Sequence, residues 1–285
     1  MYNVLALDLD GTVLTQEHTI HPAVKQAIQQ AAKQCHVMIV TGRHHTAARP
    51  YYDELGLTTP IICCNGTYIY DYQNEKVITH NALTKENALT FIELAQNDKL
   101  KMVMYITDAM VYSKIDPIDY MSAMEQWAND PTMAHPPKIY RIDSFEEQVQ
   151  QADYIWKFVV EGEPSTLERF LNFPWIKQTF NAEKSWSNRF DFAAKGNNKG
   201  TRLAEYLNSQ GYNSNQVIAV GDNHNDISMI ELAGLGVAMK NADDTVKSHA
   251  NAICATDNNG DGLARLIHEN ILGQSQWQSL WSKLH

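Results

Sequence analysis

The sequence predicts an α/β protein with a doubly wound, Rossmann-like parallel sheet and an inserted α+β domain. Short apolar runs typical of buried strands alternate with amphipathic helical segments near both ends of the chain. Several of these runs end in a polar cluster, and the carboxyl edge of such a sheet is where ligands bind. Between the two ends, a hairpin pattern and prolines replace the alternation, which indicates a separate inserted domain.

The composition is that of an ordinary globular protein with one or two domains. Of the 285 residues, 44% are hydrophobic and 20% are charged, and the formal net charge is −10. This charge argues against nucleic acid or an anionic membrane as a partner. No apolar run is long enough to span a bilayer, and a strand follows residue 3 directly, so we expect a cytoplasmic protein without a signal peptide. The four scattered cysteines predict no disulfide framework.

The first part of the chain contains three expected strands separated by two expected helices. The strands are short apolar runs bounded by turn residues, at residues 4–7, 37–40 and 60–64. The first helix covers residues 22–33 and has Pro22 in its first turn, and the second helix ends before Gly56. Repeats of this kind form right-handed βαβ units and a parallel sheet with both faces covered.

Residues 82–187 are expected to form the inserted α+β domain. The segments on either side of Thr107-Asp108 alternate apolar and polar residues, which is typical of a hairpin. The elements expected in or next to this region are a helix, the hairpin, a strand, a helix and a strand, at residues 87–96, 102–112, 154–160, 166–171 and 189–193. Residues 1–81 and 188–285 then form the core domain.

The alternation of strands and helices resumes at Gly196. A helix with Leu203 and Leu207 on one face is expected to end at Gly211. The later expected elements are a strand, a helix, two strands and a helix, at residues 217–220, 227–232, 236–239, 252–255 and 263–271. Beyond them, Trp277 and Trp281 are four residues apart and share one helical face. We expect this tail to pack on the protein's own surface, with a homodimer contact as the alternative.

Polar residues in four places are expected to meet at one edge of the core sheet. They are Asp8 and Asp10, Thr41-Gly42, Lys199, and the group Asp222, Asn225 and Asp226. Phosphoryl transfer needs a nucleophile in line with the leaving oxygen, cations near the equatorial oxygens, and a proton donor for the leaving group. A carboxylate can act as the nucleophile and form an aspartyl-phosphate. A site this rich in oxygen also suits Mg²⁺.

The carboxylates divide into distinct expected roles. Asp8 is expected to be the nucleophile and a metal ligand, because it follows directly on a buried strand. Asp10 is expected to be the general acid and base, with its main-chain carbonyl reaching the metal. Asp222 is the second carboxylate ligand, and Asp226 either completes the outer shell of the metal or orients Lys199.

The phosphate group is expected to be held by one cation and several hydrogen-bond donors. Lys199 would neutralise phosphate charge. The other donors would be the hydroxyl of Thr41 and the amides of Leu9, Gly42 and Asn225, where a helix start favours an anion. Structural alternatives exist for single residues: Thr41 as a helix N-cap, Lys199 as a solvated lysine and Asp226 as a first-turn acid. The joint occurrence of all four clusters favours the functional interpretation.

As a set, these clusters resemble the motifs of the haloacid dehalogenase superfamily, specifically Cof-type phosphatases with a C2 cap. The matching stretches are Asp8-Leu9-Asp10-Gly11-Thr12, Val40-Thr41-Gly42-Arg43, Asn198-Lys199-Gly200, and Gly221-Asp222 with Asn225-Asp226. The resemblance covers nearly the whole chain. It implies that Asp8, Asp10 and Asp222 bind Mg²⁺ and that Leu9, Thr41, Gly42, Lys199 and Asn225 contact phosphate.

Further stretches resemble a bacterial pyridoxal phosphate phosphatase of this family. They are residues 40–45, 62–68, 156–158 and 221–229. The resemblance implies pyridoxal 5′-phosphate as the substrate, with a sugar phosphate as the alternative within the family. A phospho-receiver module without turnover is the alternative from a different class, and a phosphomutase is a third option. The candidates for contacts between the inserted domain and the substrate are Tyr105, Asp108, Trp156 and Arg189, although core packing is the commoner fate of Trp156.

Two other motifs are given structural interpretations. Residues 257–262 match the first half of an EF-hand loop, but His268 stands where the bidentate Glu is required, and a strand precedes the loop in place of a helix. We therefore expect an ordinary loop near the active-site edge. His44-His45 is interpreted as a surface pair at a helix start.

Overall fold

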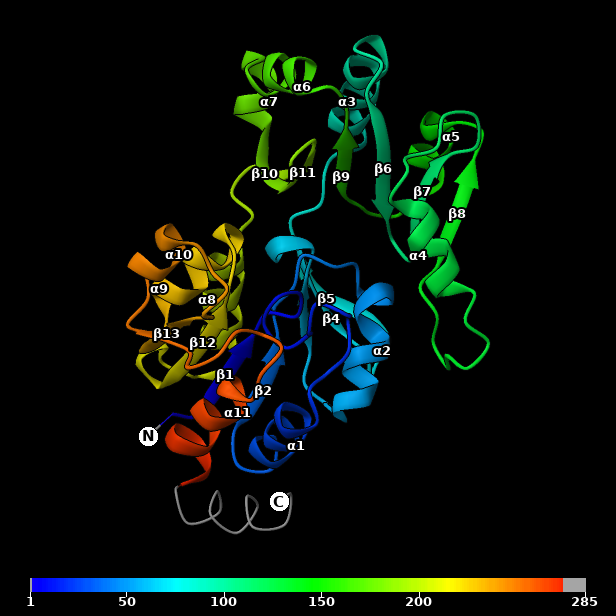
Figure 1. Ribbon diagram of the computed structural model, residues 1–285. Helices are drawn as coiled ribbons and strands as arrows, with labels where there is room; N and C mark the ends of the chain where they lie inside the picture. The colour runs from blue at the N-terminus through cyan, green and yellow to red at the C-terminus, as the bar shows by residue number, and fades with distance from the viewer. Residues whose placement is uncertain (1, 274–285) are drawn as a thin grey trace.

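The computed structural model describes residues 2–273 and divides the chain into a core body and a cap body (Figure 1). In Figure 1 the core lies below and contains both the first and the last described parts of the chain. The cap lies above it and is formed by the middle of the chain. The α/β class and the inserted second body are as predicted. Among the described residues, no helix is long and apolar enough to cross a membrane.

The core contains a parallel five-stranded sheet with the order β14-β13-β12-β1-β2. Its strands are β1 (Val4–Leu7), β2 (His36–Ile39), β12 (Val217–Gly221), β13 (Leu235–Ala238) and β14 (Ala252–Ile253). The centre of the sheet is apolar and buried on both faces, as expected for strands of a doubly wound fold. All five strands were predicted to within about two residues at each end.

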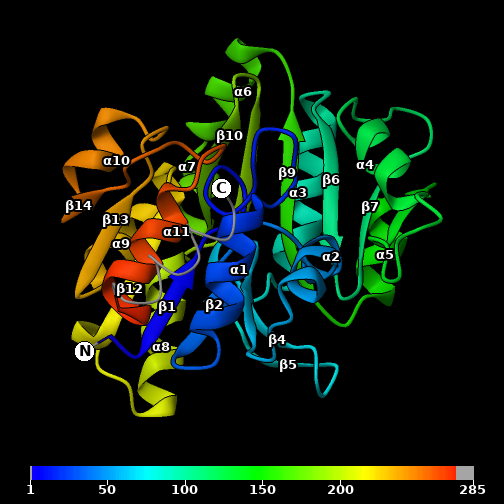
Figure 2. The same cartoon turned by 60° about the horizontal axis from the view of Figure 1, so that its bottom comes forward.

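Helices cover both faces of this sheet. Leu5 and Leu7 pack in one apolar cluster with α1 (Pro22–Ala31), α2 (His45–Leu55) and α11 (Gly262–Ile267). The alternate residues Val4 and Ala6 pack in another with α8 (Lys199–Gln210) and α9 (Ile227–Leu232). Figure 2 shows α1 and α11 over the same side of β1 and β2. Smaller elements complete the core, namely α10 (Asp244–Ser248), a π-helical turn His268–Leu272, and 3₁₀ turns Cys64–Gly66, Ser214–Gln216 and His224–Asp226.

The third predicted strand, β3 (Ile61–Cys63), joins the main sheet only through a parallel bridge between Val40 and Ile62. It continues into an antiparallel sheet with β4 (Tyr68–Asp71) and β5 (Lys76–His80), which was not predicted. The sequence of β5 lacks an apolar alternation, because the apolar Ile78 is exposed and the polar Thr79 is half-buried.

The cap is built on a six-stranded sheet with the order β10-β11-β9-β6-β7-β8. All neighbours are antiparallel except the parallel pair of β7 and β8. The strands are β6 (Lys101–Ile106), β7 (Ala109–Ser113), β8 (Ile139–Ile142), β9 (Ile155–Glu161), β10 (Phe180–Trp186) and β11 (Arg189–Ala194). The predicted hairpin is β6–β7. The strands β8 and β10 were missed because their polar residues weaken the apolar pattern.

One face of the cap sheet packs on cap helices and the other packs toward the core. Met104, Phe158 and Phe192 belong to the first face, against α3 (Lys85–Asn97), α5 (Phe145–Gln151), α6 (Pro164–Leu171) and α7 (Pro174–Thr179). Tyr105 and Trp156 belong to the second face and share an apolar cluster with residues of the core and with α4 (Met121–Ala128). The underside of the cap sheet therefore faces the edge of the core where the polar clusters were predicted.

The pairing of β11 indicates where the cap ends and the chain returns to the core. The expected boundary at residue 187 falls between β10 and β11, yet β11 pairs with both β10 and β9 in the cap sheet. We therefore propose that the return to the core lies after Ala194 and retain residue 82 as the start of the cap. The tail with Trp277 and Trp281 lies outside the described residues, so its expected packing and the homodimer alternative stay predictions.

Candidate active site

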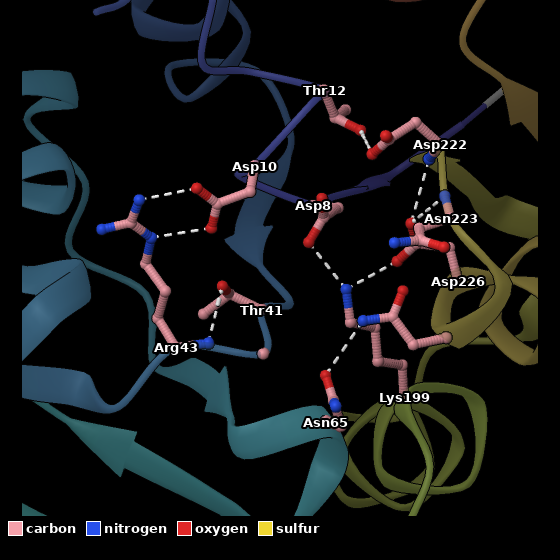
Figure 3. A network of polar contacts seen from close by, with 12 residues as sticks. Asp8, Asp10, Thr12, Thr41, Arg43, Asn65, Lys199, Asp222, Asn223 and Asp226 are labelled. Atoms are coloured by element: carbon pink, nitrogen blue, oxygen red, sulfur yellow. Dashed lines mark hydrogen bonds and ion pairs between the residues drawn. The ribbon is translucent and has the colours of Figure 1, made fainter. Parts of the chain in front are cut away.

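Asp8, Lys199 and Asp226 form the centre of the polar site (Figure 3). Asp8 follows β1, and its amide donates to Val220 of the neighbouring β12 at 3.0 Å. The Lys199 Nζ donates to Asp8 Oδ1 and to Asp226 Oδ1, both at 2.6 Å. The Lys199 side chain is fully buried, so the alternative of a solvated surface lysine is wrong. Lysine and the two carboxylates thus form one buried ionic group.

Asp226 also organises the loop after β12. Its second carboxylate oxygen accepts hydrogen bonds from the amides of Asp222 and Asn223, at 2.9 and 3.0 Å. Gly221 permits this arrangement, because a Cβ at that position would lie 2.4 Å from the Asp226 Cβ. Asp226 is therefore fixed by the loop amides and orients Lys199, which is the second of the two roles considered for it.

Asp222 completes a group of three carboxylates. The oxygens that Asp8, Asp222 and Asp226 offer all lie within 4.8 Å of one another. Asp222 accepts a hydrogen bond from the Thr12 hydroxyl at 3.1 Å, a contact that the sequence did not predict. Burial, followed by the charge of Asp226, raises the pKa of Asp222 to about 7. Burial likewise raises the pKa of Asp8 well above its usual range, although Lys199 opposes the shift.

These shifts have a simple electrostatic cause. The three carboxylates lie close together, and Lys199 donates to two of them, Asp8 and Asp226, so burial and mutual repulsion disfavour full ionisation without additional positive charge. Hard carboxylate oxygens at this spacing fit Mg²⁺, which binds through a few carboxylates and keeps part of its water. The donor set therefore fits the predicted metal. The Asp10 side chain is not part of the three-carboxylate group.

Asp10 instead forms a bidentate ion pair with Arg43. The Arg43 Nε and Nη2 donate to its two carboxylate oxygens at 2.7 and 2.6 Å. Partial burial works to raise the pKa of Asp10, but the charge and hydrogen bonds of Arg43 prevail and hold it well below its usual range. The Arg43 guanidinium carbon lies 5.0 Å from the ring centre of Tyr51 and 5.5 Å from that of Trp127 in the cap helix α4. Arg43 was not predicted to have a role at the site.

The predicted phosphate-binding residues Thr41, Gly42 and Asn225 lie next to Arg43 and Asn65. Thr41 is fully buried, and its hydroxyl accepts a hydrogen bond from the Arg43 amide at 3.1 Å. The N-cap of α2 is His44, so the interpretation of Thr41 as a helix cap is wrong. The Asn225 side chain donates to Asn65 Oδ1 at 3.1 Å. A Cβ on Gly42 would lie 2.8 Å from that same Asn65 oxygen, which explains the glycine there.

Leu9 is fully buried on the turn between Asp8 and Asp10, and the expected contact of its amide with phosphate stays a prediction. The EF-hand-like stretch is a loop that binds the segment after this turn, at residues 14 and 16. The Asn258 side chain donates to the Leu14 carbonyl at 2.8 Å, and the Gln16 amide donates to Asn259 at 3.0 Å. The expectation of a loop near the active-site edge is therefore confirmed.

His44 and His45 are both buried, so the expectation of a surface pair is wrong. The His44 ring contacts the Ile106 carbonyl of the cap at 2.9 Å. Burial is the main reason that the pKa values of both histidines fall below their usual range. His45 stacks on Tyr70, with ring centres 3.9 Å apart, and its Nε2 lies 3.5 Å from the exposed cap residue Asp108. His44 and His45 therefore lie at the interface between the core and the cap.

The other candidate cap residues differ in their surroundings. Trp156 is fully buried, stacks on Tyr68 at 4.0 Å and donates to the Thr107 carbonyl at 3.3 Å, which is a packing role. The guanidinium of Arg189 lies 4.2 Å from the ring centre of Tyr120.

The ring of Tyr105 contacts Lys157, a buried cap lysine that also binds the core. The Lys157 Nζ is 4.7 Å from the ring centre of Tyr105. It pairs with Asp191 and donates to the Gly42 carbonyl at 2.9 Å. Residues 156–158 are one of the stretches that resemble the pyridoxal phosphate phosphatase, but sequence reasoning gave neither Lys157 nor Asp191 a functional role.

Comparison with known proteins agrees with this geometry. The family model described as haloacid dehalogenase-like hydrolase matches residues 5–267. The chain is 39% identical to the pyridoxal phosphate phosphatase YbhA of Escherichia coli over 94% of this chain and 98% of that protein. It is 27% identical to the 5-amino-6-(5-phospho-D-ribitylamino)uracil phosphatase YitU of Bacillus subtilis, over 93% of this chain and 96% of that protein.

A solved haloacid dehalogenase-like hydrolase from Bacteroides thetaiotaomicron superposes with a TM-score of 0.82. Its sequence is 25% identical, and the match covers 94% of this chain and 99% of that one. The chain therefore belongs to the haloacid dehalogenase-like hydrolases. It is a phosphoric monoester hydrolase of that family, and a phosphorylated small molecule as the substrate agrees with the phosphatases that it resembles.

Proposed function

We propose that this protein is a cytoplasmic, Mg²⁺-dependent phosphatase that hydrolyses pyridoxal 5′-phosphate through an aspartyl-phosphate intermediate. The observation that carries the proposal is the buried group in which Lys199 joins Asp8 and Asp226 next to Asp222. It combines a carboxylate nucleophile, a phosphate-neutralising cation and a set of hard metal ligands at one edge of the sheet. The choice of pyridoxal 5′-phosphate rests on the likeness to YbhA.

The first chemical step belongs to Asp8. One carboxylate oxygen of Asp8 attacks phosphorus, and the bond from phosphorus to the alcohol oxygen breaks. Lys199 and the donors of Thr41, Gly42, Leu9 and Asn225 hold the phosphoryl oxygens during this step. Asp8 and Asp222, with the main-chain carbonyl of Asp10, would hold Mg²⁺, which when bound adds positive charge beside the phosphoryl group. Asp226 keeps Lys199 in place.

Proton transfer belongs to Asp10. It protonates the leaving alkoxide and then accepts a proton from the water that hydrolyses the aspartyl-phosphate. Each of its carboxylate oxygens accepts one hydrogen bond from Arg43, which favours the ionised form, so Asp10 takes up a proton against this stabilisation when it acts as the acid. Arg43 also contacts the cap residue Trp127.

The test is a measurement of phosphate release from a panel of phosphorylated metabolites, with Mg²⁺ and with EDTA. Pyridoxal 5′-phosphate is expected to give the highest kcat/KM, and chelation is expected to abolish turnover. Substitution of Asp8 by Asn should abolish turnover with every substrate while the protein remains folded. Higher kcat/KM for a hexose phosphate would refute the assigned substrate. A long-lived phosphoprotein without phosphate release would favour a phospho-receiver, and an isomerised sugar phosphate would favour a phosphomutase.

A further inference from the structure

A carboxyl group of the cap reaches into the core beside the phosphate-binding residues. Glu183 lies on β10, directly opposite Asp191 of β11. The Asn65 side chain donates a hydrogen bond to the Glu183 carboxyl group. The oxygen of the same Asn65 amide accepts from Asn225 at 3.1 Å. Glu183 is therefore separated from a proposed phosphate-binding residue by one amide side chain.

The surroundings of Glu183 are rich in negative charge. Burial, followed by the charge of Asp191, raises the pKa of Glu183 to about 7. Lys199 and Asp226 of the core site also act on this carboxyl group, which places it within electrostatic reach of the buried ionic group. The cap cation Lys157 already pairs with Asp191.

A buried carboxylate at the position of Glu183 is unfavourable unless the substrate makes a compensating interaction with it. A carboxylate beside a bound phosphate dianion is repelled by it, and the repulsion is strong where water is excluded. An ionised carboxylate has about four acceptor positions. Among residues 2–273, the Asn65 amide is the only hydrogen-bond donor to Glu183, so acceptor capacity remains for another group.

The other cap residues considered for substrate contact already use their polar groups or ring faces in contacts within the protein. Trp156 is fully buried and donates to the Thr107 carbonyl. The face of Tyr105 is covered by Lys157, and Asp191 is neutralised by the same lysine. Glu183 is thus linked to the site through Asn65, and its carboxyl group still has acceptor positions without a hydrogen bond.

We propose that Glu183 is a specificity-determining residue that accepts a hydrogen bond from the leaving group of the substrate. The substrates it favours are phosphate monoesters whose alcohol carries an O–H or N–H donor near the ester. Pyridoxal 5′-phosphate, with a protonated ring nitrogen, belongs to this class, whereas p-nitrophenyl phosphate has no donor. This inference rests on the proposed phosphatase function and concerns the selection of the alcohol.

The test compares Glu183→Gln with the wild type on pyridoxal 5′-phosphate and p-nitrophenyl phosphate, in the presence of Mg²⁺. Gln retains the shape of Glu and an oxygen that can accept from Asn65, but it lacks the charge. Because a hydrogen bond to a charged group is stronger than a neutral one, kcat/KM for pyridoxal 5′-phosphate should fall about 10- to 100-fold. With p-nitrophenyl phosphate, kcat/KM should not fall, because this substrate has no donor to lose and the variant no longer repels its phosphate group.

Glu168→Gln is the matched control, because Glu168 is an exposed cap residue on α6. It should leave both substrates unaffected. Equal losses on the two substrates in Glu183→Gln would show a general effect on the site, and no loss on either would show no contact, so both results overturn the proposal. A wild type that releases phosphate from neither substrate refutes the proposed function itself, and this inference with it.

Discussion

Replacement of Lys199 by Met tests the buried ionic group most severely. The substitution removes one ammonium and leaves Asp8 and Asp226 facing each other without their common partner. Both carboxylates are almost completely buried, so water cannot take over the two lost hydrogen bonds. Breaking a buried ion pair by removal of one partner costs about 3–5 kcal/mol. We therefore expect the free energy of unfolding to fall by about 3–5 kcal/mol at neutral pH.

The assay is urea unfolding followed by tryptophan fluorescence, with EDTA present so that residual Mg²⁺ does not replace the lost charge. The loss should be smaller at acidic pH, because protonation removes the uncompensated charge of the two carboxyl groups. Lys33→Met, at an exposed lysine after α1, is the control and should change stability little. If Lys199→Met were as stable as Lys33→Met at neutral pH, the reasoning about the buried ionic group would be refuted.

Three further substitutions probe the surroundings of this group. Arg43→Gln should reduce stability by about 1 kcal/mol at neutral pH. Because the ion pair lowers the folded-state pKa of Asp10 below its usual 3.8, the difference from the wild type should shrink as the pH falls below about 4 in urea titrations. Glu183→Gln should show the opposite sign: folding raises the pKa of this carboxyl from 4.5 to about 7, so the variant should gain stability relative to the wild type as the pH rises across that range. Gly66→Ala should lower the melting temperature and the activity, because φ is +87° and a Cβ would lie 2.1 Å from the Asn198 carbonyl oxygen at the start of α8. An Ala variant with wild-type stability would contradict this packing argument.

The sequence was most informative where local pattern and burial coincide. The run Val4-Leu5-Ala6-Leu7 is apolar because helices cover both faces of β1, and its end had to be the ligand edge of the sheet. Asp8, Lys199 and Asp222 could therefore be brought together in the prediction although almost two hundred residues separate the first two. The family resemblance supported the same set of residues.

Contacts between the two bodies could not be predicted in this way. Glu183 lies on a strand of mixed polar and apolar residues, and nothing in its local sequence indicates that it reaches Asn65. The burial of His44 depends on the cap carbonyl at Ile106, which lies sixty-two residues further along the chain. The pairing of Asp10 with Arg43 is also a tertiary fact, since the spacing of the two motifs does not specify which oxygen faces which donor.

The most direct measurement is the capture of a phosphorylated Asp8 during turnover. Wild-type protein is mixed with phosphate-labelled pyridoxal 5′-phosphate and Mg²⁺ and quenched in acid within milliseconds, and its peptides are analysed by mass spectrometry. We expect label on the peptide that contains Asp8, loss of that label on treatment with hydroxylamine, and no label in Asp8→Asn. Steady phosphate release by Asp8→Asn, or label on another residue that forms and decays at the rate of turnover, would contradict the assignment of Asp8 as the nucleophile.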